Sequence, residues 1–235
     1  METLFKIVLL IIPIAVAVVF HEIAHGYTAL RFGDRTAKDM GRLTLNPIAH
    51  IHWFGTIVMP ASIYLMTQFA MGQGFLFAFA KPVPVDMRNF NNPKRDMIWV
   101  AAAGPAMSIL LAIISAMLFR LTAWAAPEAY ILFEKGGQMA GADVTSMFLI
   151  LVFFMLLVSV NINAVLAIIN LFPLPPADGG RIVTGLLPDR LAWKYARLEN
   201  YGLGILLFVF LVNPLDIIHW TLMPAIEALV YLLLA

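Results

Sequence analysis

Long apolar runs alternate with short polar stretches along this 235-residue chain. A transmembrane helix needs roughly 20 mostly apolar residues, because each residue adds about 1.5 Å and the hydrocarbon core is about 30 Å thick. The pattern predicts membrane segments at residues 4–30, 54–71, 97–124, 144–171, 201–212 and 215–235. We therefore predict an all-α polytopic membrane protein with five to six transmembrane helices.

Two polar stretches on either side of the second apolar run have a different pattern. Gly41–Pro47 and Ala80–Asp86 are typical of short extended segments, and Pro82 and Pro84 remove amide donors from one edge of the second. The apolar run between them can enter the membrane and return to the same side. After the first helix we therefore predict a small membrane-associated β-hairpin with a re-entrant segment.

The positive charges favour the re-entrant arrangement. Lys and Arg in short loops are retained on the cytoplasmic side of a membrane. If residues 54–71 return to the side they came from, twelve of the fifteen cations share one face, and only Lys6, Arg120 and Lys135 lie on the other. The end of the first helix then lies near the cytoplasm. Since no polar stretch exceeds about thirty residues, we expect one membrane domain over residues 1–235, with the hairpin and re-entrant region at 31–96.

Composition narrows the class of protein further. The chain is 62% hydrophobic and only 12% charged, about half the charged share of an ordinary soluble domain. Its net charge of +1 gives no basic field for a nucleic acid. We expect an integral, multi-pass membrane protein in contact with the lipid bilayer. Because cysteine is absent, any metal must be bound by His, Asp or Glu.

The first apolar run contains the sequence His21-Glu22-Ile-Ala-His25. Residues four apart on a helix project from one side, so the two imidazoles can share a cation such as Zn²⁺. Glu22 is turned about 100° from His21, which makes it a poor ligand but a suitable base for a metal-activated water. The alternative is a buried polar triad that forms hydrogen bonds between helices.

A catalytic zinc site needs a third protein ligand. Asp178 is the outstanding candidate, in the sequence Asn170-Leu-Phe-Pro-Leu-Pro-Pro-Ala-Asp-Gly-Gly-Arg at the end of an apolar run. Prolines end the preceding helix there, and the two glycines permit a sharp change of direction. The alternative for Asp178 is an ordinary helix cap.

Together these segments resemble the site-2 protease family of intramembrane zinc metalloproteases, peptidase family M50, in its short, core-only branch. The matching motifs occur in the family's order over most of the chain: His21–Gly26, Gly33-Asp34, Gly41–Pro47, Lys81–Val85, Ala103–Pro105 and Asn170–Gly180.

The resemblance implies one zinc ion per chain, bound by His21, His25 and Asp178. It implies that Glu22 is the catalytic base and that Asn170 holds the substrate or the oxyanion. Ser108 stands where the family often has Asn after Gly-Pro, and we expect it not to touch a proposed ligand.

The expected function is an intramembrane zinc endopeptidase that cleaves membrane proteins in or near their transmembrane segments. We expect it in a prokaryotic cell (inner) membrane, with its site toward the cytoplasm. The rival hypotheses are a cation transporter with an intramembrane proton relay and an inactive scaffold that binds membrane helices. A second metal site at His50 and His52 is a further hypothesis, although the sequence offers it no third ligand nearby.

Overall fold

The computed structural model describes residues 2–71, 80–136, 143–213 and 216–235. This part of the chain is helical, with short 3₁₀ and π-helical turns between the α-helices. The α-helices are α1 (Glu2–Arg31), α2 (Thr36–Asp39), α3 (Met59–Met71), α4 (Pro93–Ala125), α5 (Pro127–Glu134), α6 (Val144–Leu171), α7 (Asp178–Leu186), α8 (Asp189–Ala196), α9 (Gly202–Val212) and α10 (Met223–Leu234).

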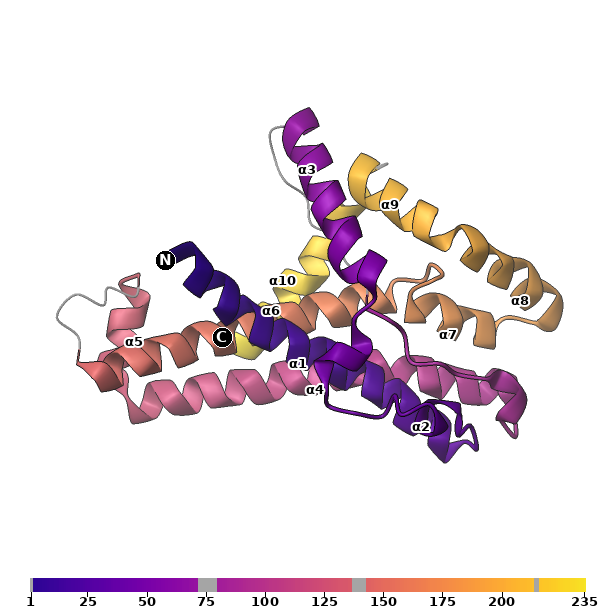
Figure 1. The fold of residues 1–235 in the computed structure, drawn as a ribbon, viewed down its shortest axis with the longest axis horizontal. Helices are drawn as coiled ribbons and strands as arrows, with labels where there is room; N and C mark the ends of the chain where they lie inside the picture. Colours follow the sequence, from indigo (N-terminus) through magenta and orange to yellow (C-terminus); the bar gives the residue numbers. More distant parts are fainter. Residues whose placement is uncertain (1, 72–79, 137–142, 214–215) are drawn as a thin grey trace.

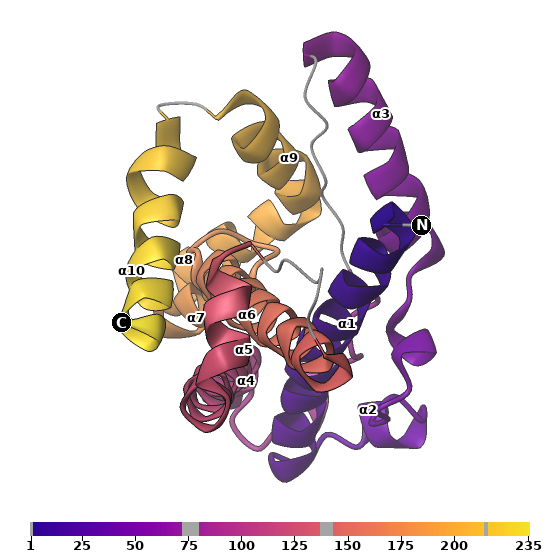
Figure 2. The same cartoon turned by 90° about the vertical axis from the view of Figure 1, so that its left-hand side faces the viewer.

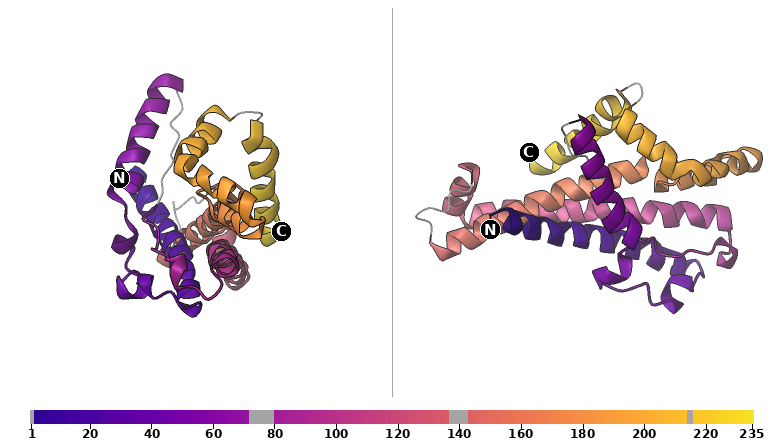
Figure 3. Two further views of the ribbon diagram at one scale, coloured as in Figure 1. Left: turned by 90° about the vertical axis from the view of Figure 1, so that its right-hand side faces the viewer. Right: turned by 45° about the horizontal axis from the view of Figure 1, so that its top comes forward.

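Three long helices, α1, α4 and α6, lie side by side along the length of the molecule (Figure 1; Figure 3, right). Small residues line their shared core, where they let the helix backbones approach closely. These buried small residues are Ala17 in α1, Ala101, Gly104, Ala112 and Ala116 in α4, and Ala164 and Ala167 in α6. Helices α3 and α9 project from this bundle (Figures 1 and 2).

Local sequence explains where the core helices begin and end. The Asp143 carboxylate caps α6 by accepting hydrogen bonds from the amides of Thr145 and Ser146. Pro93 starts α4, because proline is well tolerated at a first helical position, where its missing N–H is not needed. Helix α6 ends at Leu171, two residues before Pro173.

The prediction of five to six transmembrane helices was wrong for the described residues. Three helical segments are long and apolar enough to cross a membrane: Leu9–Arg31, Pro93–Ala125 and Val144–Leu171. A fourth exists only if the bent pair of segments 189–201 and 204–212 counts as one span. Helix α9 has 11 residues, and the apolar helix that ends with α10, Ile218–Leu234, has 17; at about 1.5 Å per residue neither covers about 30 Å of hydrocarbon.

The predicted β-hairpin was also wrong, because the described residues contain no β-strand. Residues 80–86 have no regular secondary structure, and they do not pair with residues 41–47. Side chains bind the backbone of this segment in place of a neighbouring strand: Arg42 donates to the carbonyls of Lys81 and Pro82, and Val83 donates its amide to Glu22. Because Pro82 and Pro84 have no N–H, one edge of the segment also lacks the backbone donors that pairing with a neighbouring strand requires. Residues 72–79, which connect the predicted re-entrant segment to residues 80–86, lie outside the described residues.

Asp34, fully buried just after α1, ties this polar region together. Its carboxylate accepts hydrogen bonds from the Asp86 amide at 2.8 Å, the Asn89 side chain at 2.8 Å and the Thr36 amide at 3.0 Å. Burial alone raises the pKa of Asp34, but the hydrogen bonds from Thr36, Asn89 and Asp86 outweigh burial and hold its pKa below the usual value. Asp34 thus anchors the end of residues 80–86 to the end of α1.

Candidate metal centre

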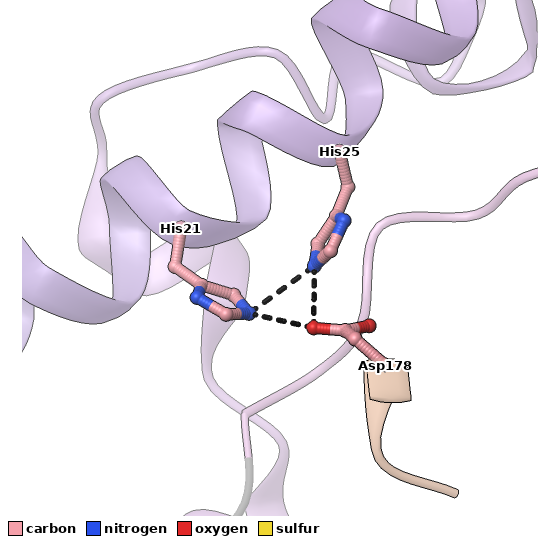
Figure 4. Close-up of side chains that lie close together, drawn as sticks. All are labelled: His21, His25 and Asp178. Atoms are coloured by element: carbon pink, nitrogen blue, oxygen red, sulfur yellow. Dashed lines mark hydrogen bonds and ion pairs between the residues drawn. The ribbon is translucent and has the colours of Figure 1, made fainter. Parts of the chain in front are cut away.

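Helix α1 brings His21 and His25 together on the side that faces α4 and α7 (Figure 4). The two residues are one helical turn apart, and their Nε2 atoms lie 3.1 Å from each other. His21 is 4% exposed, so its ring is almost entirely removed from solvent. The spacing read from the sequence therefore gives a pair of converging imidazoles inside the bundle.

Asp178, at the start of α7, completes the group. Its Oδ2 atom lies 3.2 Å from the Nε2 atom of His21 and 3.2 Å from that of His25 (Figure 4). The two glycines after Asp178 allow α7 to begin directly against the end of α6. A Cβ atom on Gly179 would lie 2.2 Å from the Leu171 carbonyl oxygen, and one on Gly180 would lie 2.3 Å from the Pro175 nitrogen. Larger residues at these positions would push Asp178 away from the histidines.

Helix α4 orients both imidazole rings. The Nδ1 atom of His25 lies 2.7 Å from the Val100 carbonyl oxygen, which can only accept, so Nδ1 carries the proton. In a neutral ring Nε2 then has a free lone pair directed at Asp178. The Nδ1 atom of His21 lies 3.0 Å from Oγ of Ser108, which is completely buried. The expectation that Ser108 touches no proposed ligand was wrong.

Gly104 makes room for the site. A Cβ atom at this position of α4 would lie 2.3 Å from Nε2 of His25 and 2.6 Å from Nε2 of His21. Any side chain would therefore occupy the space between the helix and the two Nε2 atoms.

The chemistry of this group fits a bound cation. Oδ2 of Asp178 is buried and accepts no hydrogen bond from the described residues, an arrangement that is costly without a positive charge nearby. Two nitrogens and one oxygen at separations of 3.1 and 3.2 Å are spaced as ligands of a tetrahedral zinc, whose bonds of 2.0–2.1 Å place neighbouring ligands about 3.3 Å apart. His21, His25 and Asp178 are thus suited to a zinc ion.

Glu22 is turned about 100° from His21 around α1, and its carboxylate is not one of the three converging groups. Its Oε2 atom accepts a hydrogen bond of 2.8 Å from the backbone amide of Val83. The side chain is partly exposed. Glu22 therefore adjoins the candidate ligands in sequence, but its carboxylate binds the Val83 amide. This arrangement is compatible with a role as a base and not as a ligand.

The structure does not bring Asn170 into contact with the three candidate ligands. Its amide nitrogen donates to the Leu166 carbonyl within α6, at 2.9 Å. An amide group has two N–H donors, so this hydrogen bond leaves the second donor for another partner. The role that the resemblance gives Asn170 stays a prediction.

His50 and His52 have local partners that explain them without a metal. Nε2 of His50 donates to the Thr44 carbonyl at 3.0 Å, and Nδ1 of His52 accepts from the Gly55 amide at 3.0 Å. Among the described residues, His21, His25 and Asp178 form the one group of His, Asp or Glu side chains that could bind a metal. The hypothesis of a second site at His50 and His52 therefore has no support.

Sequence reasoning missed the contributions of Ser108, Val100 and Val83. The spacing of Gly104 and Ser108, one turn apart on an apolar helix, was a usable signal for a face of α4 that lies against another helix. The Val100 carbonyl and the Val83 amide are backbone groups, so the residue types at these positions could not indicate their contacts with His25 and Glu22.

Comparison with known proteins assigns the chain to a family. The sequence model described as peptidase family M50 matches residues 9–212. The Bacillus subtilis (strain 168) protein named "Putative zinc metalloprotease YwhC" is 36% identical over 219 residues, which cover 93% of this chain and 86% of that protein.

A second relative is more distant. The Mycolicibacterium smegmatis protein named "Putative zinc metalloprotease Rip2" is 24% identical over 207 residues, covering 85% of this chain and 67% of that protein. No solved structure matches the chain. The family match nevertheless spans the whole of the metal centre described above, and the chain belongs to peptidase family M50.

Proposed function

We propose that this membrane protein is an intramembrane zinc endopeptidase that hydrolyses peptide bonds in or near transmembrane segments of other membrane proteins. The observation that carries the proposal is the convergence of His21, His25 and Asp178 from α1 and α7, with Glu22 beside the first histidine. These three residues would hold one zinc ion per chain. Membership of family M50 and the names of the two relatives support the same chemistry.

Glu22 is the group of this chain that we assign to proton transfer. Zinc, when bound, lowers the pKa of a coordinated water toward about 7 and polarises a carbonyl oxygen. The Glu22 carboxylate accepts the proton that water loses as its oxygen bonds to the peptide carbonyl carbon. It then gives this proton to the amine nitrogen as the C–N bond breaks. The second N–H of Asn170 is a donor for the developing negative charge on the carbonyl oxygen.

A substrate helix must unwind locally before cleavage, because an intact helix keeps its carbonyls in hydrogen bonds within the helix. Water must also reach the site. His25 lies six residues before Arg31, where α1 ends, so at about 1.5 Å per residue it is roughly 9 Å from that end. We place this end at the cytoplasmic face of a prokaryotic cell membrane, because most cations of the chain gather on that side.

The test is proteolysis in reconstituted liposomes. Candidate single-span membrane substrates are mixed with wild-type protein, with the Glu22→Gln variant, and with protein treated with a chelator and then with zinc. We expect product from the wild type, no product from Glu22→Gln although it retains zinc, and recovery of activity when zinc is restored. A cation relay or an inactive scaffold would keep its function in Glu22→Gln. Cleavage that continues in that variant would rule the proposal out.

A further inference from the structure

A backbone amide from a distant segment is bound to the proposed catalytic base. The Val83 N–H donates to Oε2 of Glu22 at 2.8 Å, across 61 residues of sequence. Val83 lies in the segment 80–86, which has no regular secondary structure, and the residue is 7% exposed. The contact joins the one acidic side chain of α1 that adjoins the metal centre to a part of the chain outside the bundle of α1, α4 and α6.

Val83 is held against the same face of α1 that carries Glu22. Gly26 lies one helical turn after Glu22, and a Cβ atom on Gly26 would lie 3.0 Å from Cγ1 of Val83. The absence of a side chain at Gly26 thus lets the segment approach the helix closely. At that distance the Val83 amide reaches the carboxylate of the preceding turn.

The position of the segment is fixed on both sides of Val83. Nη2 of Arg42 donates to the Lys81 carbonyl at 2.9 Å and to the Pro82 carbonyl at 3.4 Å, and Arg42 is only 7% exposed. The Lys81 amide donates to the His50 carbonyl at 2.9 Å. Beyond Val83, the Asp86 amide donates to Asp34 at 2.8 Å. These contacts hold the peptide group in place before any substrate arrives.

The prolines on either side make the Val83 amide distinctive. Pro82 and Pro84 have no N–H, so residue 83 supplies the only backbone donor in this three-residue stretch. Proline also restricts the residue before it, here Val83, to extended conformations. The sequence of the segment therefore presents a single donor, and the structure places that donor on Glu22.

We propose that the Val83 amide positions the Glu22 carboxylate for proton transfer, an inference that rests on the proposed function. The hydrogen bond fixes Oε2 and limits rotation of a long, partly exposed side chain, which leaves Oε1 as the oxygen that exchanges protons with water and with the leaving amine. A base that is already oriented loses less conformational freedom when the reaction begins. Val83 is thus a positioning residue, and its main-chain group does the positioning.

The contact can be removed without changing the carboxylate. The Val83→Pro substitution deletes the N–H in a segment that is neither helix nor strand and already contains Pro82 and Pro84. Val85→Pro is the matched control, because the Val85 amide has no hydrogen bond to Glu22. Val83→Ile keeps the amide and a β-branched side chain and serves as the conservative variant. For each protein we would measure zinc content, KM and kcat for one cleaved membrane substrate.

We expect Val83→Pro to lower kcat about 10- to 100-fold, with zinc content and KM close to those of the wild type. Val83→Ile should keep kcat within about twofold, and Val85→Pro should keep most of it. An unchanged kcat in Val83→Pro, or an equal loss in Val85→Pro, would overturn the inference. A higher kcat in Val83→Pro would show that the contact restrains Glu22 instead, which also overturns it.

Two further measurements separate the possible causes of failure. If Val83→Pro does not fold or loses zinc, replacing the amide of residue 83 by an ester removes the N–H and keeps the Val83 side chain. A fall in kcat of the ester protein then supports the inference, and an unchanged kcat contradicts it.

Glu22→Gln is measured in parallel. If it remains active, the proposed function itself fails, whereas an inactive Glu22→Gln with a fully active Val83→Pro rejects only the positioning role.

Discussion

Oγ of Ser108 lies 3.0 Å from Nδ1 of His21, a residue 87 positions earlier in the chain. The same helix, α4, places the Val100 carbonyl 2.7 Å from Nδ1 of His25. Each candidate ligand from α1 therefore has its outward nitrogen held by α4 while its Nε2 atom faces Asp178. Groups that orient metal-binding histidines in this way fix both the ring and its tautomer.

Removing the Ser108 hydroxyl tests whether α4 tunes metal binding. We expect Ser108→Ala to weaken zinc affinity about 10- to 100-fold, because the His21 ring loses its orienting partner and Nδ1 is left buried without one. The measurement is competition for zinc with a chelator of known affinity. Ser115→Ala is the control, since Ser115 is a buried serine of α4 that bonds Ser159 instead. Equal affinities in both variants would show that Ser108 has no such role.

Adding one methyl group at Gly104 should block the site. Because a Cβ atom there would lie 2.3 Å from Nε2 of His25, we expect Gly104→Ala to reduce bound zinc by about tenfold or more. Gly204→Ala in α9 is the matched control, because its Cβ atom would meet nothing within 4 Å. Metal analysis of purified protein distinguishes the two. Full zinc content in Gly104→Ala would mean that the site can rearrange around the methyl group.

The carboxylate of Asp178 should be indispensable for the metal. Asp178→Asn keeps the size of the side chain but removes its charge, so we expect zinc affinity to fall at least about 100-fold. Asp189→Asn offers a comparison, since Asp189 also begins a short helix but lies at the surface beside Lys94. Zinc titration of both variants is the measurement. Wild-type affinity in Asp178→Asn would exclude this residue as a ligand.

Asp34 should contribute to stability in a pH-dependent way. Its folded-state pKa is lowered, so its hydrogen bonds stabilise the protein above the unfolded pKa, near 4, and this stabilisation is lost as the pH falls through the folded value. At pH 7 we expect Asp34→Asn to lower the free energy of unfolding by about 1–3 kcal/mol.

Thermal unfolding in detergent between pH 7 and pH 3 checks the prediction for Asp34. The difference between wild type and Asp34→Asn should narrow below about pH 4, where the unfolded-state carboxylate takes up a proton first. Asp39→Asn is a suitable control, because Asp39 is exposed. A difference that is constant over this range would indicate that the charge of Asp34 is not involved.

The sequence was most informative where a feature depends on local spacing. Residues four apart in the first apolar run predicted the converging histidines, and the length of three apolar runs predicted α1, α4 and α6. The motif order predicted the family. The organisation as a single domain stays a prediction.

The local sequence pattern could not predict the structure where a backbone group has several possible hydrogen-bond partners. The extended pattern at 80–86 was compatible with a hairpin, but Arg42 and Glu22 bind its main chain in place of a strand, so no ladder forms. The short final helices depend on the break at Asn213, whose φ is 46° and which ends α9 after 11 residues. Apolar composition alone could not distinguish two short helices from two spans.

The sequence by itself determined which chemistry this protein carries: a chain without cysteine, with two histidines one turn apart and a glutamate beside them in an apolar helix. Only the tertiary structure decided how that chemistry is held. Asp178, the Ser108 hydroxyl, the Val100 carbonyl and the Val83 amide reach the histidines and the glutamate from 61 to 157 residues away. The periodicity of a sequence indicates on which face of its own helix a residue lies. Contacts between residues so far apart in the sequence depend on how the helices pack against one another.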